Sequence, residues 1–128
     1  MITTNGRSAR VVDCWKDGEY DLVASPLWLT ELDDVVKRPK FATTIDLEDV
    51  ARLRSLIVHE ATIFDDPPPQ PGLTPDPKDD YLVGLARASL CDVLVASDAH
   101  LLGLADPRPP VLTPRAFLAL LGAAANRR

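Results

Sequence analysis

The sequence predicts a single α/β domain in which helices cover both faces of a parallel sheet. Short β-rich runs alternate with helical segments along the chain, and each run has the length of one strand. The chain has 128 residues, of which 46% are apolar, so it can bury one core but not two. Such alternation is typical of three-layer α/β/α folds. We therefore expect residues 1–128 to form one domain of this class.

Five helices are expected, and three of them begin with the same signal. A capping side chain is followed by proline at the first helical position, in Ser25-Pro26, Asp76-Pro77 and Thr113-Pro114. These helices are expected over residues 26–36, 77–89 and 114–125. Two more are predicted from apolar periodicity, one over residues 8–16 that ends at Gly18, and one beginning at the capping residue Asp46.

Four β-rich runs lie between these helices, and we expect a strand in each: residues 20–24, 61–64, 92–96 and 110–112. The stretch from residue 65 to 78 holds six of the twelve prolines and shows no periodicity. It therefore predicts a stiff loop within the domain rather than a domain boundary.

Composition excludes several classes of protein. The net charge of −5 argues against a protein that binds nucleic acid by bulk charge. It does not exclude a nuclease that contacts phosphate through metal ions. No run approaches the ~20 apolar residues of a membrane span, and residues 1–7 lack the pattern of a signal peptide. Two cysteines, Cys14 and Cys91, are too few for a disulfide scaffold, so buried free thiols and a cytoplasmic location are expected.

Three carboxylates are expected at the carboxyl ends of the strands, where open α/β sheets build their sites. Asp98 follows the run 92–96, Asp79 lies in the first turn of the helix that begins at Pro77, and Glu31 lies in the helix after the run 20–24. Carboxylates that converge on one rim repel each other unless a cation is bound. Mg²⁺ and Mn²⁺ prefer such oxygen ligands.

Each of these acids also has a simpler interpretation. Asp76 is explained as a helix cap, and Asp79 and Asp80 as first-turn acids that favour the helix dipole. Glu31 suits a solvated helix face, and Asp98 suits a turn. Taken singly, none of these positions is specific for a metal site.

Four segments, read in order, resemble PIN domains: residues 25–32, 76–86, 91–98 and 111–118. The nearest branch contains the toxin components of bacterial toxin–antitoxin systems. The resemblance implies a parallel sheet flanked by helices, divalent-metal-dependent cleavage of RNA, and control by a cognate antitoxin protein. A homodimer is a further partner to consider.

The resemblance also assigns the site. Glu31 matches the family's helix glutamate, Asp79 the aspartate that opens the next acidic helix, and Asp98 the aspartate after the following strand. These three are the expected catalytic residues, and together with Asp76 they are the expected ligands of Mg²⁺ or Mn²⁺. Asp80 is a capping or supporting candidate.

The sequence departs from the family pattern at its start. The family begins with an apolar strand that ends in Asp-Thr-Asn, whose aspartate is a metal ligand, and nothing here matches it. We expect that the chain starts late, that the runs 20–24 and 92–96 lose a shared neighbour in the sheet, and that activity is impaired. A copy extended by about fifteen upstream residues is expected to melt more cooperatively. A smaller departure is Ala96-Ser97, where the family commonly has Thr-Gly.

The sequence leaves two alternative functions, of which the first gains weight from the missing ligand. The first is a non-catalytic PIN remnant that binds an antitoxin or dimerises. The second, a phosphoacceptor domain, is disfavoured because no suitably placed lysine completes its pocket. The run Lys37–Lys40 is the densest basic candidate for RNA contact, although a solvated helix terminus explains it as well. His100 is expected to be structural, with a role near the scissile phosphate as the alternative.

Overall fold

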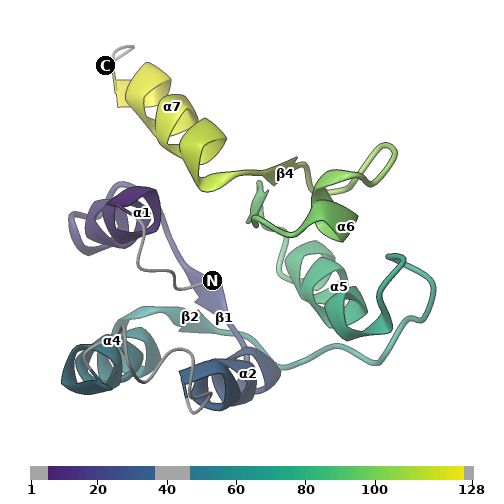
Figure 1. Cartoon of the computed structure of the whole chain (residues 1–128), viewed down its shortest axis with the longest axis horizontal. Helices are drawn as coiled ribbons and strands as arrows, with labels where there is room; N and C mark the ends of the chain where they lie inside the picture. The colour runs from purple at the N-terminus through teal and green to yellow at the C-terminus, as the bar shows by residue number, and fades with distance from the viewer. Residues whose placement is uncertain (1–5, 37–46, 126–128) are drawn as a thin grey trace.

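The computed structural model describes residues 6–36 and 47–125 (Figure 1). Its helical elements are α1 (Gly6–Lys16), α2 (Pro26–Val36), α4 (Leu47–Glu60), η1 (Pro77–Asp79), α5 (Asp80–Ala88), α6 (Ala99–Leu102) and α7 (Pro114–Ala125). The helices predicted over 26–36 and 114–125 are confirmed. The helix predicted over 77–89 begins as the 3₁₀ turn η1 and continues as α5. The predicted cap Asp46 and the basic run Lys37–Lys40 lie outside the described residues.

The strands are β1 (Val23–Ala24), β2 (Thr62–Ile63), β3 (Leu94–Val95) and β4 (Val111–Leu112). β1 pairs with β2 and β3 with β4, both in parallel, which confirms the α/β class. The described residues form two separate two-stranded sheets, as expected if the runs 20–24 and 92–96 lack a shared neighbour. Pairing cannot continue from one sheet to the other because no described strand lies between β1 and β3.

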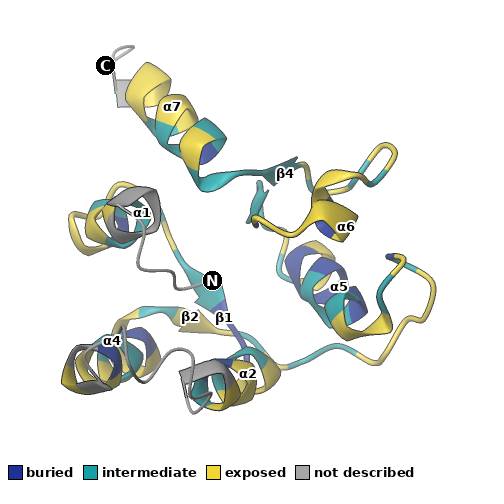
Figure 2. Cartoon of the chain, viewed as in Figure 1, coloured by how far each residue is buried: buried dark blue, intermediate teal, exposed yellow. Residues whose placement is uncertain are grey.

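The apolar core is divided in the same way (Figure 2). The first cluster is built on the buried residues Trp15, Ala24 and Ile57, beside β1. The second is built on Val83, Ala96 and Leu101, beside β3. Each small sheet therefore has its own core cluster. Cys14 and Cys91 are free thiols as expected, but they are half-buried rather than buried.

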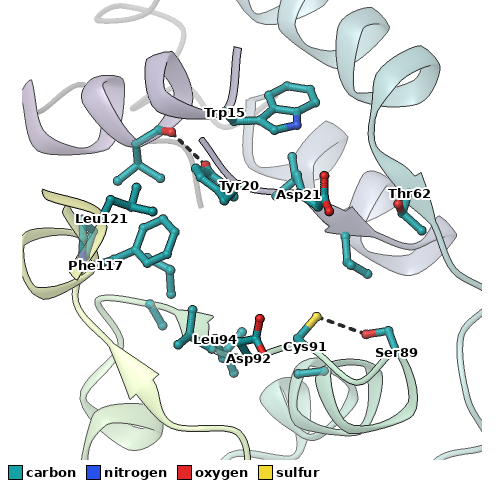
Figure 3. A pocket seen from close by; sticks show the side chains of 18 of the residues that line it. Trp15, Tyr20, Asp21, Thr62, Ser89, Cys91, Asp92, Leu94, Phe117 and Leu121 are labelled. Atoms are coloured by element: carbon teal, nitrogen blue, oxygen red, sulfur yellow. Dashed lines mark hydrogen bonds between the residues drawn. The ribbon is translucent and has the colours of Figure 1, made fainter. Parts of the chain in front are cut away.

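Tyr20 connects the two ends of the chain. Its hydroxyl donates to the backbone oxygen of Val11 in α1 at 2.8 Å, and its ring meets Phe117 of α7 edge to face, with 4.9 Å between ring centroids (Figure 3). Burial is the main reason that the pKa of Tyr20 rises to about 12. α1 and α7 are thus held side by side.

None of the described helices is both long and apolar enough to cross a membrane.

The start of α2 is fixed by side chains that satisfy its free backbone N–H groups. Ser25, which is fully buried, accepts from Trp28 N at 3.2 Å through its hydroxyl oxygen. Asp66, in the proline-rich loop, accepts from Leu27 N at 2.9 Å. Since α2 carries Glu31, these two caps determine where that carboxylate lies.

Ser25→Ala is expected to lower the free energy of unfolding by about 1 kcal/mol, because it removes a helix cap. Urea denaturation of the two proteins measures this difference. Thr30→Ala is the matched control on the same helix: its hydroxyl is exposed and donates only to Pro26 O, so its effect should stay within about 0.5 kcal/mol. An equal loss for both variants would contradict the capping role of Ser25.

Candidate metal-binding active site

A buried aspartate shapes the loop that leads into the site. Asp80 is only 8% exposed, and its carboxylate accepts from Thr74 N at 2.7 Å, Thr74 Oγ1 at 2.9 Å and Gly72 N at 3.1 Å. These bonds fold residues 72–76 back over the start of α5. Asp80 therefore lies in the first turn of α5, as predicted, and its buried side chain supports this loop.

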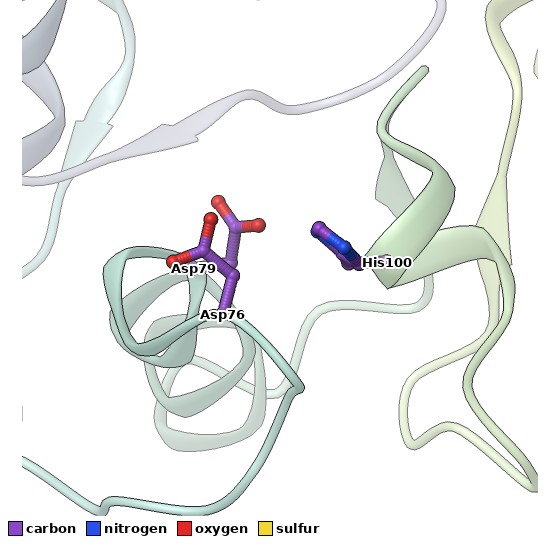
Figure 4. A group of neighbouring side chains, drawn as sticks. All are labelled: Asp76, Asp79 and His100. Carbon is purple, nitrogen blue, oxygen red and sulfur yellow. The ribbon is translucent and has the colours of Figure 1, made fainter.

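Asp76 caps η1, as its place before Pro77 predicts. Its Oδ1 accepts from Lys78 N at 3.0 Å, and its backbone is extended, with φ −109° and ψ 114°. The same carboxylate lies beside Asp79 (Figure 4). Capping and membership of the acidic cluster are thus compatible for this residue.

Asp79 is an acid whose surroundings disfavour its ionisation. Its Oδ2 is buried and has no hydrogen-bond partner among the described residues. Burial raises the pKa of its carboxyl group, and the negative charges of Asp98, Asp76 and Glu31 raise it further, whereas His100 acts in the opposite direction. Four acids thus share one region, and a positive charge there would be favourable.

The short helix α6 brings His100 to the same place. Asp98 caps α6 by accepting from His100 N at 2.7 Å and Leu101 N at 3.4 Å. This cap makes His100 the second residue of α6, and its imidazole faces the two aspartates across the site (Figure 4). One ligand atom each from Asp76, Asp79 and His100 lies within 4.8 Å of the other two. A structural role alone does not account for this placement of His100, which favours the alternative of a role in the site.

Glu31 reaches the site from α2. It is held by Tyr81, whose hydroxyl donates to Glu31 Oε2. Burial, followed by this bond to the carboxylate, raises the pKa of Tyr81 well above its ordinary value, so its hydroxyl stays a donor. Tyr81 follows Asp79 by two residues, so the bond also links α2 to α5.

The predicted residues therefore fall into two groups. Asp76 and Asp79 lie together with His100. Glu31 and Asp98 lie close enough to act on the charge of Asp79, yet Tyr81 and the α6 backbone already engage them in this structure. Sequence reasoning did not place His100 among the metal ligands. Asp98 and His100 are two residues apart at the predicted start of a helix, and this spacing is the signal that could have indicated the role of His100.

The donor set fits a divalent cation. Two carboxylates and an imidazole, with Glu31 and Asp98 nearby, offer mainly hard oxygen ligands and one nitrogen. The buried Oδ2 of Asp79, which has no hydrogen-bond partner among the described residues, is the observation that favours a bound cation. A buried charged oxygen without a partner is costly unless something binds it.

The fold and the site define an α/β protein with a clustered acidic centre at the strand ends. A family model of the PIN domain matches residues 2–100, which is more than half of the 128 residues, so the chain belongs to the PIN domain family. No curated protein and no solved structure matches the chain. Membership indicates a nuclease-type function in general, and PIN domains generally depend on divalent metal ions.

In EDTA, where no divalent ion offsets the charge, Asp79→Asn is expected to raise the melting temperature at pH 7 by a few degrees. Because the pKa of Asp79 is raised on folding, the folded state holds more protons than the unfolded chain between the two pKa values. The free energy of unfolding therefore falls as pH rises through that window. Above the window, the full cost of ionising Asp79 in the folded protein is present. The variant should lose this part of the pH dependence in thermal melts between pH 4 and about 8.

Asp106→Asn is the matched control, because it removes one negative charge from a side chain that is 84% exposed. It should leave the melting temperature and its pH dependence nearly unchanged. A melting temperature that is lower for Asp79→Asn than for the control would contradict an uncompensated buried charge at Asp79.

Proposed function

We propose that this PIN domain is a divalent-metal-dependent endoribonuclease. The observation that carries the proposal is the buried, unpartnered Oδ2 of Asp79, in a group with Asp76 and His100 whose ligand atoms lie within 4.8 Å of one another. Mg²⁺ and Mn²⁺ are the ions that suit this mainly oxygen donor set.

Each residue has a distinct part in the proposed reaction. Asp76, Asp79 and His100 would hold one or two ions, and Glu31 and Asp98 would join them as direct or water-mediated ligands. A bound divalent ion supplies a nucleophilic water at neutral pH and offsets the charge of the scissile phosphate. Tyr81 orients Glu31, and Asp80 keeps the loop that carries Asp76 in place.

The biological role we propose is that of a cytoplasmic toxin of a toxin–antitoxin system, held in check by a cognate antitoxin. Support comes from the four ordered motifs that resemble this branch of the PIN domains. The net charge of −5 is compatible with RNA as substrate, since the cation would provide the attraction to phosphate.

A second candidate function is a non-catalytic PIN domain that binds an antitoxin or dimerises. The divided sheet favours it, because both the sheet and the core are interrupted between β1 and β3. No described residue supplies the aspartate that the family carries at the end of its first strand, so we also propose that the chain as printed has impaired activity. RNA cleavage separates the two candidates.

Asp79→Asn is expected to reduce Mn²⁺-dependent cleavage of single-stranded RNA by about 10² or more, because it removes the charged oxygen of the metal site. Glu31→Gln should act in the same direction. Product formation on denaturing gels, with and without EDTA, measures the loss. Asp106→Asn should cleave like the unchanged protein. Equal cleavage by Asp79→Asn and the unchanged protein would show that the activity belongs to a contaminant.

Tyr81→Phe is expected to weaken Mn²⁺ binding several-fold while leaving the fold intact, because Glu31 loses the hydroxyl that orients it. Mn²⁺ titration followed by electron paramagnetic resonance measures the affinity directly. Tyr20→Phe is the matched control: it removes a hydroxyl bonded to Val11 O, away from the site, and should change stability but not Mn²⁺ affinity. Unchanged affinity in Tyr81→Phe would refute the positioning role.

A further inference from the structure

Asp76 lies in a stiff segment that has few backbone hydrogen-bond donors. Residues 74–77 read Thr-Pro-Asp-Pro, and both prolines lack a backbone N–H, so Asp76 N is the one donor between Thr74 and Lys78. A proline also favours an extended backbone in the residue before it. Asp76 is extended, with φ −109° and ψ 114°. The placement of this residue therefore depends on what its own N–H and C=O groups contact.

The hydroxyl of Thr74 contacts both of these backbone groups. Thr74 is only 8% exposed, and its Oγ1 accepts from Asp76 N at 3.2 Å. The hydroxyl donates to Asp76 O at 2.5 Å or to Asp80 Oδ1 at 2.9 Å, since it has one proton for the two oxygens. A single buried hydroxyl thus connects Asp76 to the first turn of α5.

The backbone oxygen of Asp76 also contacts the second aspartate of the site. Asp76 O accepts from Asp79 N at 3.0 Å, so the Thr74 hydroxyl and the Asp79 amide meet at the same oxygen. The ligand atoms of Asp76, Asp79 and His100 lie within 4.8 Å of one another (Figure 4). A rotation of the Asp76 backbone would change this spacing directly.

The side chain of Asp76 is restrained as well. Its Oδ1 accepts from Lys78 N at 3.0 Å as the cap of η1. The N–H, the C=O and one carboxylate oxygen of Asp76 are therefore all engaged within residues 74–80. Its second carboxylate oxygen, Oδ2, has no partner among the described residues and is left for a cation.

We propose that Thr74 is a positioning residue of the metal site. Its hydroxyl fixes the Asp76 backbone against α5 and so sets the spacing between the carboxylates of Asp76 and Asp79. Thr74 contacts the backbone of a ligand and acts only through it. The inference rests on the metal site of the proposed function and does not depend on RNA as the substrate.

The fold of the loop does not depend on this hydroxyl alone. The carboxylate of Asp80 also accepts from Thr74 N at 2.7 Å and from Gly72 N at 3.1 Å, and both bonds remain when the hydroxyl is removed. What is lost is the acceptor of Asp76 N and one donor to Asp76 O. Removal of the hydroxyl should therefore alter the metal site more than the stability of the protein.

Thr74→Val tests this inference, because valine keeps the branched shape and lacks the hydroxyl. It should weaken Mn²⁺ binding to the full chain about tenfold, as measured by electron paramagnetic resonance well below the melting temperature. The affinity in question is that of the Mn²⁺ which Asp79→Asn fails to bind. Thr74→Ser restores the hydroxyl and should bind Mn²⁺ like the unchanged protein. Thr74→Ala, which also lacks the hydroxyl, decides the matter if Thr74→Val does not fold.

Thr113→Val is the matched control. Thr113 Oγ1 accepts from Ala116 N at 3.1 Å at the start of α7, so this variant loses a helix cap. It should melt at a lower temperature than the unchanged protein and bind Mn²⁺ with the same affinity.

Two results would overturn the positioning role of Thr74. One is an unchanged Mn²⁺ affinity in Thr74→Val, and the other is an equal loss of affinity in Thr74→Ser. Absence of Mn²⁺ binding by the unchanged protein would overturn the proposed metal site and this inference together. Absence of RNA cleavage by a protein that binds Mn²⁺ would overturn only the nuclease function.

Discussion

The site depends on one electrostatic constraint, the placement of the Asp79 carboxylate where water reaches it poorly and other acids surround it. Its buried Oδ2 lacks a partner in the described part of the chain, and Asp98, Asp76 and Glu31 all disfavour its ionisation. Such an arrangement costs stability unless a cation is bound. A protein that only needed to fold would gain by replacing this residue, so the charge points to a function.

Local rules bring this arrangement about. Asp76 and Pro77 start η1, which sets Asp79 in the first turn before α5, and the bonds of Asp80 to the 72–74 loop hold that start in place. Asp98 starts α6 and so directs His100 across the site. Two helix starts, from segments about twenty residues apart in the sequence, thus face each other at the carboxyl ends of the strands, as α/β folds commonly build their sites.

The sequence predicted those features that depend on neighbouring residues. The first residues of α2 and α7 follow from a capping side chain next to proline, a signal contained in two residues. The extent of the strands could not be predicted in this way, since ladder length depends on partners far along the chain. Runs of three to five residues therefore pair over only two.

The same distinction holds within the site. Asp76 and Asp79 were recognisable from the helix start and the family motif, whereas the role of Asp80 depends on a loop that returns to it from Gly72 and Thr74. His100 was given a structural role because a lone histidine carries little information by itself. Its importance emerges only when α6 and η1 are placed side by side.

The most direct measurement is the position of Mn²⁺ in crystals of the protein, located by its anomalous scattering. The account predicts a peak within coordination distance of Asp79 Oδ2 and shared with Asp76 or His100, which disappears in crystals of Asp79→Asn. Crystals grown with Mn²⁺ that show no peak at these residues, or a peak that persists in Asp79→Asn, would contradict a metal centre built on this buried carboxylate.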